Sequence, residues 1–137
     1  MSRFISRRIA AAAAMLAACG GAFAAVTGAI QNWNPNNGDV FARYQSFSWG
    51  QSGWFKNTGP GTTDIKAITL LNDPVGQYTE HIWDNVAAGG SQIPYSMWTS
   101  SSIATPGGYT AQHYLISWPD GGQPTTLSYK SGTYSVC

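Results

Sequence analysis

Short clusters of turn-forming residues punctuate this chain and limit what it can fold into. Gly, Pro, Asn and Asp dominate these clusters, because they supply a positive φ, a fixed φ or a side-chain-capped turn. The segments between the clusters are too short for long helices and have the length of β-strands. The clusters fall at residues 34–39, 50–53, 57–61, 72–76, 89–90, 105–108, 119–122 and 131–132.

The segments between the turns are rich in Val, Ile, Thr, Tyr and Trp, which are residues that favour strands. No window has a 3.6-residue apolar repeat, whereas several segments alternate between two faces. The sequence therefore predicts an all-β fold, a mainly antiparallel β-sandwich of about eight or nine short strands. We expect the strands at 26–33, 40–49, 53–57, 64–71, 77–86, 92–98, 109–118, 124–130 and 133–137.

The composition excludes several other classes of protein. Charged residues make up 9% of the chain, against roughly 25% in an average soluble protein. Coiled coils and helix bundles need far more Glu, Lys, Arg and Leu. An aromatic content of 13% argues against intrinsic disorder. A chain of 137 residues has room for one hydrophobic core, so we expect a single domain.

Residues 1–24 have the pattern of a secretory signal peptide. Residues 1–8 contain three arginines and no acid, and a short apolar stretch rich in alanine follows. Residues 22–24 read Ala-Phe-Ala, which predicts cleavage after Ala24 and a β-sandwich domain over 25–137. Residues 16–19 also resemble a bacterial lipobox, so the alternative is cleavage before Cys19 and lipidation of that cysteine.

This segment determines the expected compartment. Its apolar stretch is too short and too rich in alanine for a membrane span, which needs about 20 strongly apolar residues, so we expect no transmembrane span in the mature chain. The protein is then secreted or periplasmic, or, with a lipidated Cys19, an outer-membrane lipoprotein. Cys137 is the other cysteine. It is either an inert terminal thiol or the site of a disulfide to a partner.

The charge that remains after residue 24 excludes a nucleic-acid partner. Four basic and six acidic side chains remain, which gives a net charge of −2. A mildly acidic chain lacks the excess of positive charge that binds the phosphates of nucleic acids. The charged side chains in this count are Arg43, Lys56, Lys66, Lys130, Asp39, Asp64, Asp73, Glu80, Asp84 and Asp120.

Tryptophan placement predicts a binding surface. Five of the six tryptophans lie where an expected strand meets a polar loop. Trp49 and Trp54 bracket the expected loop at 50–53, with Tyr44 nearby. A tryptophan at such a place can stack on a sugar ring or lie at a membrane interface, or it can cap the core. We therefore expect ligand binding by Trp49, Trp54, Tyr44 and Trp98.

The sequence contains no recognisable catalytic or metal-binding set. His81 and His113 are the histidines, and Glu80 and Asp84 face away from His81 on an alternating strand. No metal-ligand spacing, phosphate loop or dinucleotide fingerprint occurs, so we expect no metal and no cofactor. We expect no enzyme activity. The alternative is a hydrolase that uses His81 or His113.

These features favour a small exported binding protein. A neutral polar surface with exposed aromatics suits a neutral glycan or another cell-surface ligand, in the manner of a lectin. The alternative is a protein-partner role as an inhibitor, immunity protein or toxin subunit, or as a membrane-binding cytolysin-like protein, since aromatic patches also serve protein interfaces.

Overall fold

The computed structural model describes residues 25–118 and 122–137. Within these ranges the chain forms strands and turns and no helix, which confirms the all-β prediction. The expected signal peptide and Cys19 lie outside the described residues. No helix in the described part of the chain is long and apolar enough to cross a membrane.

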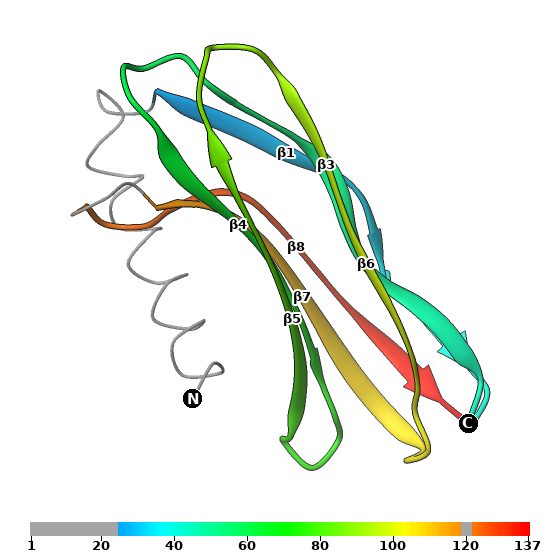
Figure 1. Ribbon diagram of the computed structural model, residues 1–137. Helices are drawn as coiled ribbons and strands as arrows, with labels where there is room; N and C mark the ends of the chain where they lie inside the picture. Colours follow the sequence, from blue (N-terminus) through cyan, green and yellow to red (C-terminus); the bar gives the residue numbers. More distant parts are fainter. Residues whose placement is uncertain (1–24, 119–121) are drawn as a thin grey trace.

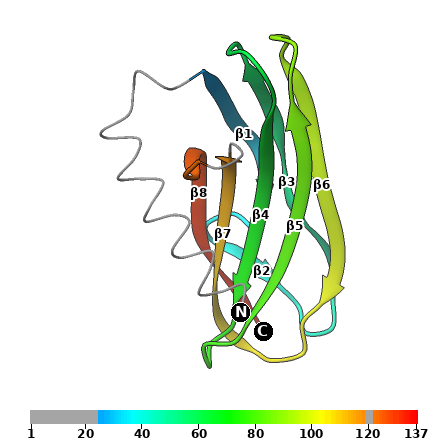
Figure 2. The same cartoon turned by 60° about the vertical axis from the view of Figure 1, so that its left-hand side comes forward.

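Eight strands form two facing sheets (Figures 1 and 2). The three-stranded sheet has the order β1-β3-β6, and the five-stranded sheet has the order β2-β8-β7-β4-β5. All neighbouring strands are antiparallel except β2 and β8, which are parallel. The strands are β1 (Val26–Asn34), β2 (Asp39–Phe41), β3 (Ser46–Asn57), β4 (Thr63–Asn72), β5 (Tyr78–Ala87), β6 (Ile93–Ser102), β7 (Gly107–Trp118) and β8 (Thr125–Val136).

The expected loop at 50–53 is wrong, because β3 runs unbroken through it. The glycines there allow neighbouring backbones to approach closely and do not form a turn. A Cβ atom at Gly50 would lie 2.0 Å from the carbonyl oxygen of Met97, and one at Gly53 would lie 1.9 Å from that of Ala29. The expected break at Ser131-Gly132 is wrong for the same reason, because a Cβ at Gly132 would lie 2.6 Å from the nitrogen of Asn37.

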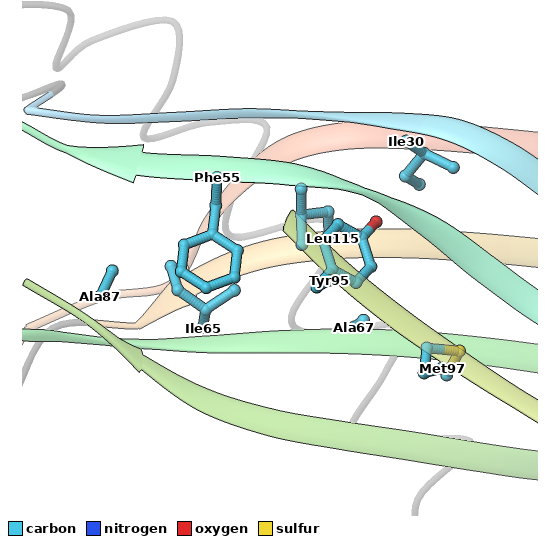
Figure 3. Packing of buried hydrophobic residues seen from close by; sticks show 8 residues of the cluster. All are labelled: Ile30, Phe55, Ile65, Ala67, Ala87, Tyr95, Met97 and Leu115. Carbon is cyan, nitrogen blue, oxygen red and sulfur yellow. The ribbon is translucent and has the colours of Figure 1, made fainter. Parts of the chain in front are cut away.

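The main hydrophobic core lies between the two sheets. Phe55 of β3 packs towards Ile65 and Ala67 of β4 and Leu115 of β7, and β6 adds Tyr95 and Met97 (Figure 3). A second cluster fills the other end of the sandwich with the aromatic rings of Phe47, Trp49, Tyr109 and Tyr134. Because strand residues alternate between faces, each of these residues leaves its chain neighbours on an outward face.

A third apolar cluster lies on the outward face of the five-stranded sheet. Ile68 and Leu70 of β4 pack there with Tyr114 and Ile116 of β7. Large apolar side chains with substantial exposure flank this cluster on the edge strand β5 and on β8, namely Ile82, Val86 and Tyr129. The two outward faces of the sandwich therefore differ, because β3 and β6 of the three-stranded sheet present mainly serines and no such apolar cluster.

Candidate functional site

The alternation along β3 separates Trp49 from Trp54. Trp49 points into the core, where it is 2% exposed and packs in the same cluster as Phe47 and Leu71. Trp54 lies five residues further on and therefore points to the outward face. The two indoles do not form one surface, because the loop that would have paired them does not exist.

The outward face of the three-stranded sheet carries Trp54 together with Trp98 of β6. Trp98 is 40% exposed and pairs with Gly50, which has no side chain to crowd the indole. Serines occupy most of the remaining outward positions of β3 and β6. We call this surface the serine–tryptophan face, and its cross-strand pairs are Trp54–Pro94, Ser52–Ser96, Gly50–Trp98, Ser48–Ser100 and Ser46–Ser102.

The two indoles are spaced for an extended ligand. Trp98 lies four residues along β6 from Pro94, the partner of Trp54. With a rise of about 3.4 Å per residue and strands about 4.8 Å apart, the two Cα atoms are roughly 14 Å apart. A single small ring cannot contact both indoles over that distance, whereas a chain of several rings can.

Polar groups without formal charge fill the space around the indoles. The Asn32 side chain on β1 donates a hydrogen bond to Ser52 Oγ at 3.3 Å, which extends the polar surface across all three strands. No charged residue occurs within β1, at positions 46–54 of β3 or in β6. The central part of the face can therefore recognise hydroxyl groups and apolar ring surfaces. Lys56, two residues beyond Trp54 on the same outward side of β3, supplies a positive charge at its edge.

Tyr44 lies at the end of the same sheet, two residues before β3 begins. Its backbone N–H donates to the carbonyl of Ile103 at 3.1 Å, and its side chain is 69% exposed. It is the one non-glycine residue with a positive φ, 66°, in the described part of the chain. A bulky residue in that conformation is uncommon, and such backbone strain concentrates at binding sites.

Of the four expected binding residues, Trp54 and Trp98 share one outward face, Tyr44 is exposed in the turn before β3, and Trp49 is buried in the core. The serines and Asn32 were missed. They would have been found if 46–57 and 93–102 had been recognised as whole strands, because alternation then places Ser48, Ser52, Ser96 and Ser100 beside the two indoles.

His113 is a structural residue in the core. It is fully buried, with Nε2 3.2 Å from the carbonyl oxygen of Pro35 and Nδ1 3.0 Å from Thr69 Oγ1. Because a carbonyl only accepts, Nε2 carries the proton and Nδ1 accepts from the threonine hydroxyl. Burial lowers the pKa of His113 from 6.5 to about 4, and the imidazole is therefore neutral at neutral pH.

A buried glutamine extends this polar network across the sandwich. Gln51 of β3 donates from Nε2 to the carbonyl oxygens of Ile68 at 3.2 Å and Tyr114 at 3.1 Å, both in the opposite sheet. Its Oε1 accepts from the Tyr95 hydroxyl at 2.6 Å. The network fixes the spacing of the sheets and has no contact with solvent.

His81 lies on the inward face of β5, with its ring centroid 5.8 Å from that of Trp49 in an edge-to-face arrangement. Asp84 points the other way and pairs with Lys66 at 2.6 Å on the outward face.

In the described ranges no group of three or more His, Cys, Asp or Glu side chains could hold a metal ion. Cys137 is a free, exposed thiol.

No protein-family model matches this chain, and no curated protein matches it. Among solved structures, the CARDB domain of a Pyrococcus furiosus protein, in complex with di-metal ions, is 14% identical with a TM-score of 0.48. That match covers 82% of this chain and 87% of the domain. A Pseudomonas fluorescens alkylpurine DNA glycosylase, bound to DNA containing an abasic site analog, is 15% identical with a TM-score of 0.47. That match covers 89% of this chain and 33% of the glycosylase, so the chain spans about a third of that protein.

Proposed function

We propose that this protein is an exported, non-enzymatic binding module that recognises a neutral glycan through its serine–tryptophan face. The observation that carries the proposal is the placement of two outward indoles on a serine-lined sheet whose central part carries no charged side chain. Aromatic rings stack on the apolar surface of sugar rings, and the serine and asparagine side chains can exchange hydrogen bonds with sugar hydroxyls. The spacing of the indoles favours an oligosaccharide or polysaccharide over a single sugar.

Alanine substitution of the two indoles tests this proposal. Trp54→Ala and Trp98→Ala should each weaken binding of the polysaccharide identified on a glycan array by ~1–3 kcal/mol, by analogy with aromatic stacking on bases. Isothermal titration calorimetry measures the loss. Tyr129→Ala is the matched control, because Tyr129 is an exposed aromatic on the other sheet. Equal affinities of the Trp54→Ala variant, the Trp98→Ala variant and the parent protein would refute the proposal.

The proposed compartment is the periplasm or the cell exterior, and its support is the N-terminal sequence pattern described above. Mass spectrometry of the N-terminal peptide of the purified protein tests this compartment. A chain that begins at Ala25 indicates a free protein, and an acylated Cys19 indicates an anchored one. A full-length product in the cytosol would contradict both.

An apolar patch on the outward face of the five-stranded sheet supports a second candidate function. Exposed Ile82, Val86 and Tyr129 flank the third apolar cluster, and surfaces of this kind serve protein partners. In this role the protein is an inhibitor, immunity protein or toxin subunit whose partner presents a complementary apolar surface. Ile82→Ser should then abolish recovery of one identified cell-envelope protein and leave glycan binding unchanged.

A further inference from the structure

Strand β6 forms a free edge of the three-stranded sheet (Figure 2). Among the described strands it pairs with β3 alone, and the register of that pairing is regular over all ten residues from Ile93 to Ser102. The N–H and C=O groups of an antiparallel strand point alternately to its two sides, so about half of the residues in β6 direct theirs away from β3. These groups form a regular ladder that another strand can extend.

The other sheet edges have features that block pairing with a further strand. On β1 the register is irregular after Ile30, and β2 is only three residues long. Strand β5 carries the charged side chains of Glu80 and Asp84. Bulges, short length and charge are the means by which proteins protect sheet edges. Strand β6 has no bulge and no charge, and its one proline, Pro94, is its second residue and leaves the rest of the strand open.

The residues of β6 are arranged symmetrically around Trp98. If two copies of β6 pair antiparallel with Trp98 opposite Trp98, Ser96 of each copy faces Ser100 of the other. On the inward side, Met97 then faces Thr99. Aromatic pairs and hydroxyl pairs across strands stabilise antiparallel sheets, and no like charges oppose each other in this arrangement. The edge therefore fits a second copy of itself, and the two-fold axis closes the assembly at a dimer.

We infer that this protein forms a dimer in which β6 pairs with β6 of a second copy, with Trp98 opposite Trp98. The pairing joins the two three-stranded sheets into one continuous sheet. The serine–tryptophan faces then form one surface, on which Trp54 and Trp98 of both copies lie in a single diagonal row. In an ideal sheet the two outer Trp54 Cα atoms are roughly 30 Å apart. The dimer goes beyond the proposed function, because it needs no ligand and doubles the number of indoles available to one long polymer.

Sedimentation velocity of the mature protein tests the dimer. Pairing of two strand edges buries little surface, and interfaces below about 1,200 Å² are characteristic of weak complexes. The dimer should therefore dissociate on dilution within the range from about 1 mM to about 5 μM. A reducing agent is present throughout, because Cys137 is an exposed thiol that could link two copies covalently. A parent protein that stays monomeric at about 1 mM would overturn the inference.

Two double variants test the register around Trp98. Ser96→Lys combined with Ser100→Lys places a lysine opposite a lysine twice across the interface, which should weaken the dimer at least about fivefold at about 50 mM NaCl. Ser96→Lys combined with Ser100→Glu places opposite charges there and should restore dimerisation to at least the level of the parent. Both serines are exposed, so the substitutions disturb no core packing. If the Lys–Glu variant dimerises no better than the Lys–Lys variant, the inference is wrong.

A matched control separates edge pairing from the effect of net charge. Ser48 and Ser52 are the β3 partners of Ser100 and Ser96, on the same outward face but one strand further from the edge. Ser48→Lys combined with Ser52→Lys adds the same charge as the Lys–Lys variant and should leave the dissociation constant within about twofold of the parent. Equal weakening by this control would mean that net charge, and not strand pairing, controls association.

The dimer and the proposed function can fail independently, because sedimentation requires no glycan. If the Lys–Lys variant dissociates while the two tryptophan-to-alanine variants bind polysaccharide as the parent does, the dimer stands and the glycan site does not. The five-stranded sheet is the competing interface, with Ile82 exposed on its outward face. If Ile82→Ser abolishes the dimer and the Lys–Lys variant keeps it, the inference is wrong.

Discussion

At the scale of single residues, the buried histidine makes stability depend on pH. The folded-state pKa of His113 is about 4, below the value of 6.5 for an exposed histidine. Between these values the unfolded chain binds a proton that the folded chain excludes. The stabilising contribution is therefore complete above about pH 6.5 and is lost as the pH falls towards 4.

We expect the free energy of unfolding to fall by roughly 2 kcal/mol between about pH 7 and about pH 5 through this residue alone. Urea titrations at several pH values measure the fall. His113→Gln removes the titrating group, so its stability, whatever its absolute value, should change by clearly less over the same range. Parallel pH profiles for the variant and the parent would show that another group is responsible.

The sequence predicted ligand binding by Trp54, Trp98 and Tyr44, for a reason that the structure corrects. The two tryptophans were expected where strands meet loops, whereas they lie within strands and point outward, and Tyr44 was expected within a strand, whereas it lies in a turn. Trp49 could not be placed, because its burial depends on the opposite sheet, where Leu71 and Tyr109 contact the same cluster. Contacts between sheets leave no periodic signal in a single strand.

At the scale of elements, the sequence predicted the bounds of some strands closely and those of others poorly, such as β6, which was expected at 92–98 and spans Ile93–Ser102. The expected strands at 64–71 and 77–86 match β4 and β5 within one residue at each end. The expected breaks within β3 and β8 are wrong because glycines were read as turns. The expected strand at 40–49 is wrong because the chain turns between β2 and β3, where Tyr44 has a positive φ. A glycine that forms a turn and a glycine that allows close backbone approach look alike without the neighbouring strand.

Gly50 should tolerate no side chain. Its φ of +144° disfavours other residues, and an added Cβ would meet the Met97 carbonyl oxygen. Gly50→Ala should lower the free energy of unfolding by about 2–5 kcal/mol through strain and overpacking. Gly108→Ala is the control, since a Cβ there has no atom within 4 Å, and it should be close to neutral. Urea denaturation of both variants checks this, and similar stabilities would contradict the close approach.

At the scale of the whole molecule, the absence of charged residues from the central part of the serine–tryptophan face predicts how binding responds to salt. Attraction between charges weakens with ionic strength, whereas stacking and neutral hydrogen bonds do not. The affinity for the polysaccharide should change by less than about threefold between about 50 mM and about 500 mM NaCl. Calorimetry at both concentrations measures it. A large loss at high salt would indicate that charged side chains outside this face bind the ligand.

The position of the first strand determines which end of the sandwich lies beside the N-terminal segment. Ala25 lies beside the β3–β4 turn, because its carbonyl accepts from the Thr58 N–H at 2.9 Å. The β4–β5 turn lies at the far end of β4, which spans about 30 Å. A molecule tethered through its N-terminal end would therefore hold the β4–β5 turn away from the anchoring surface.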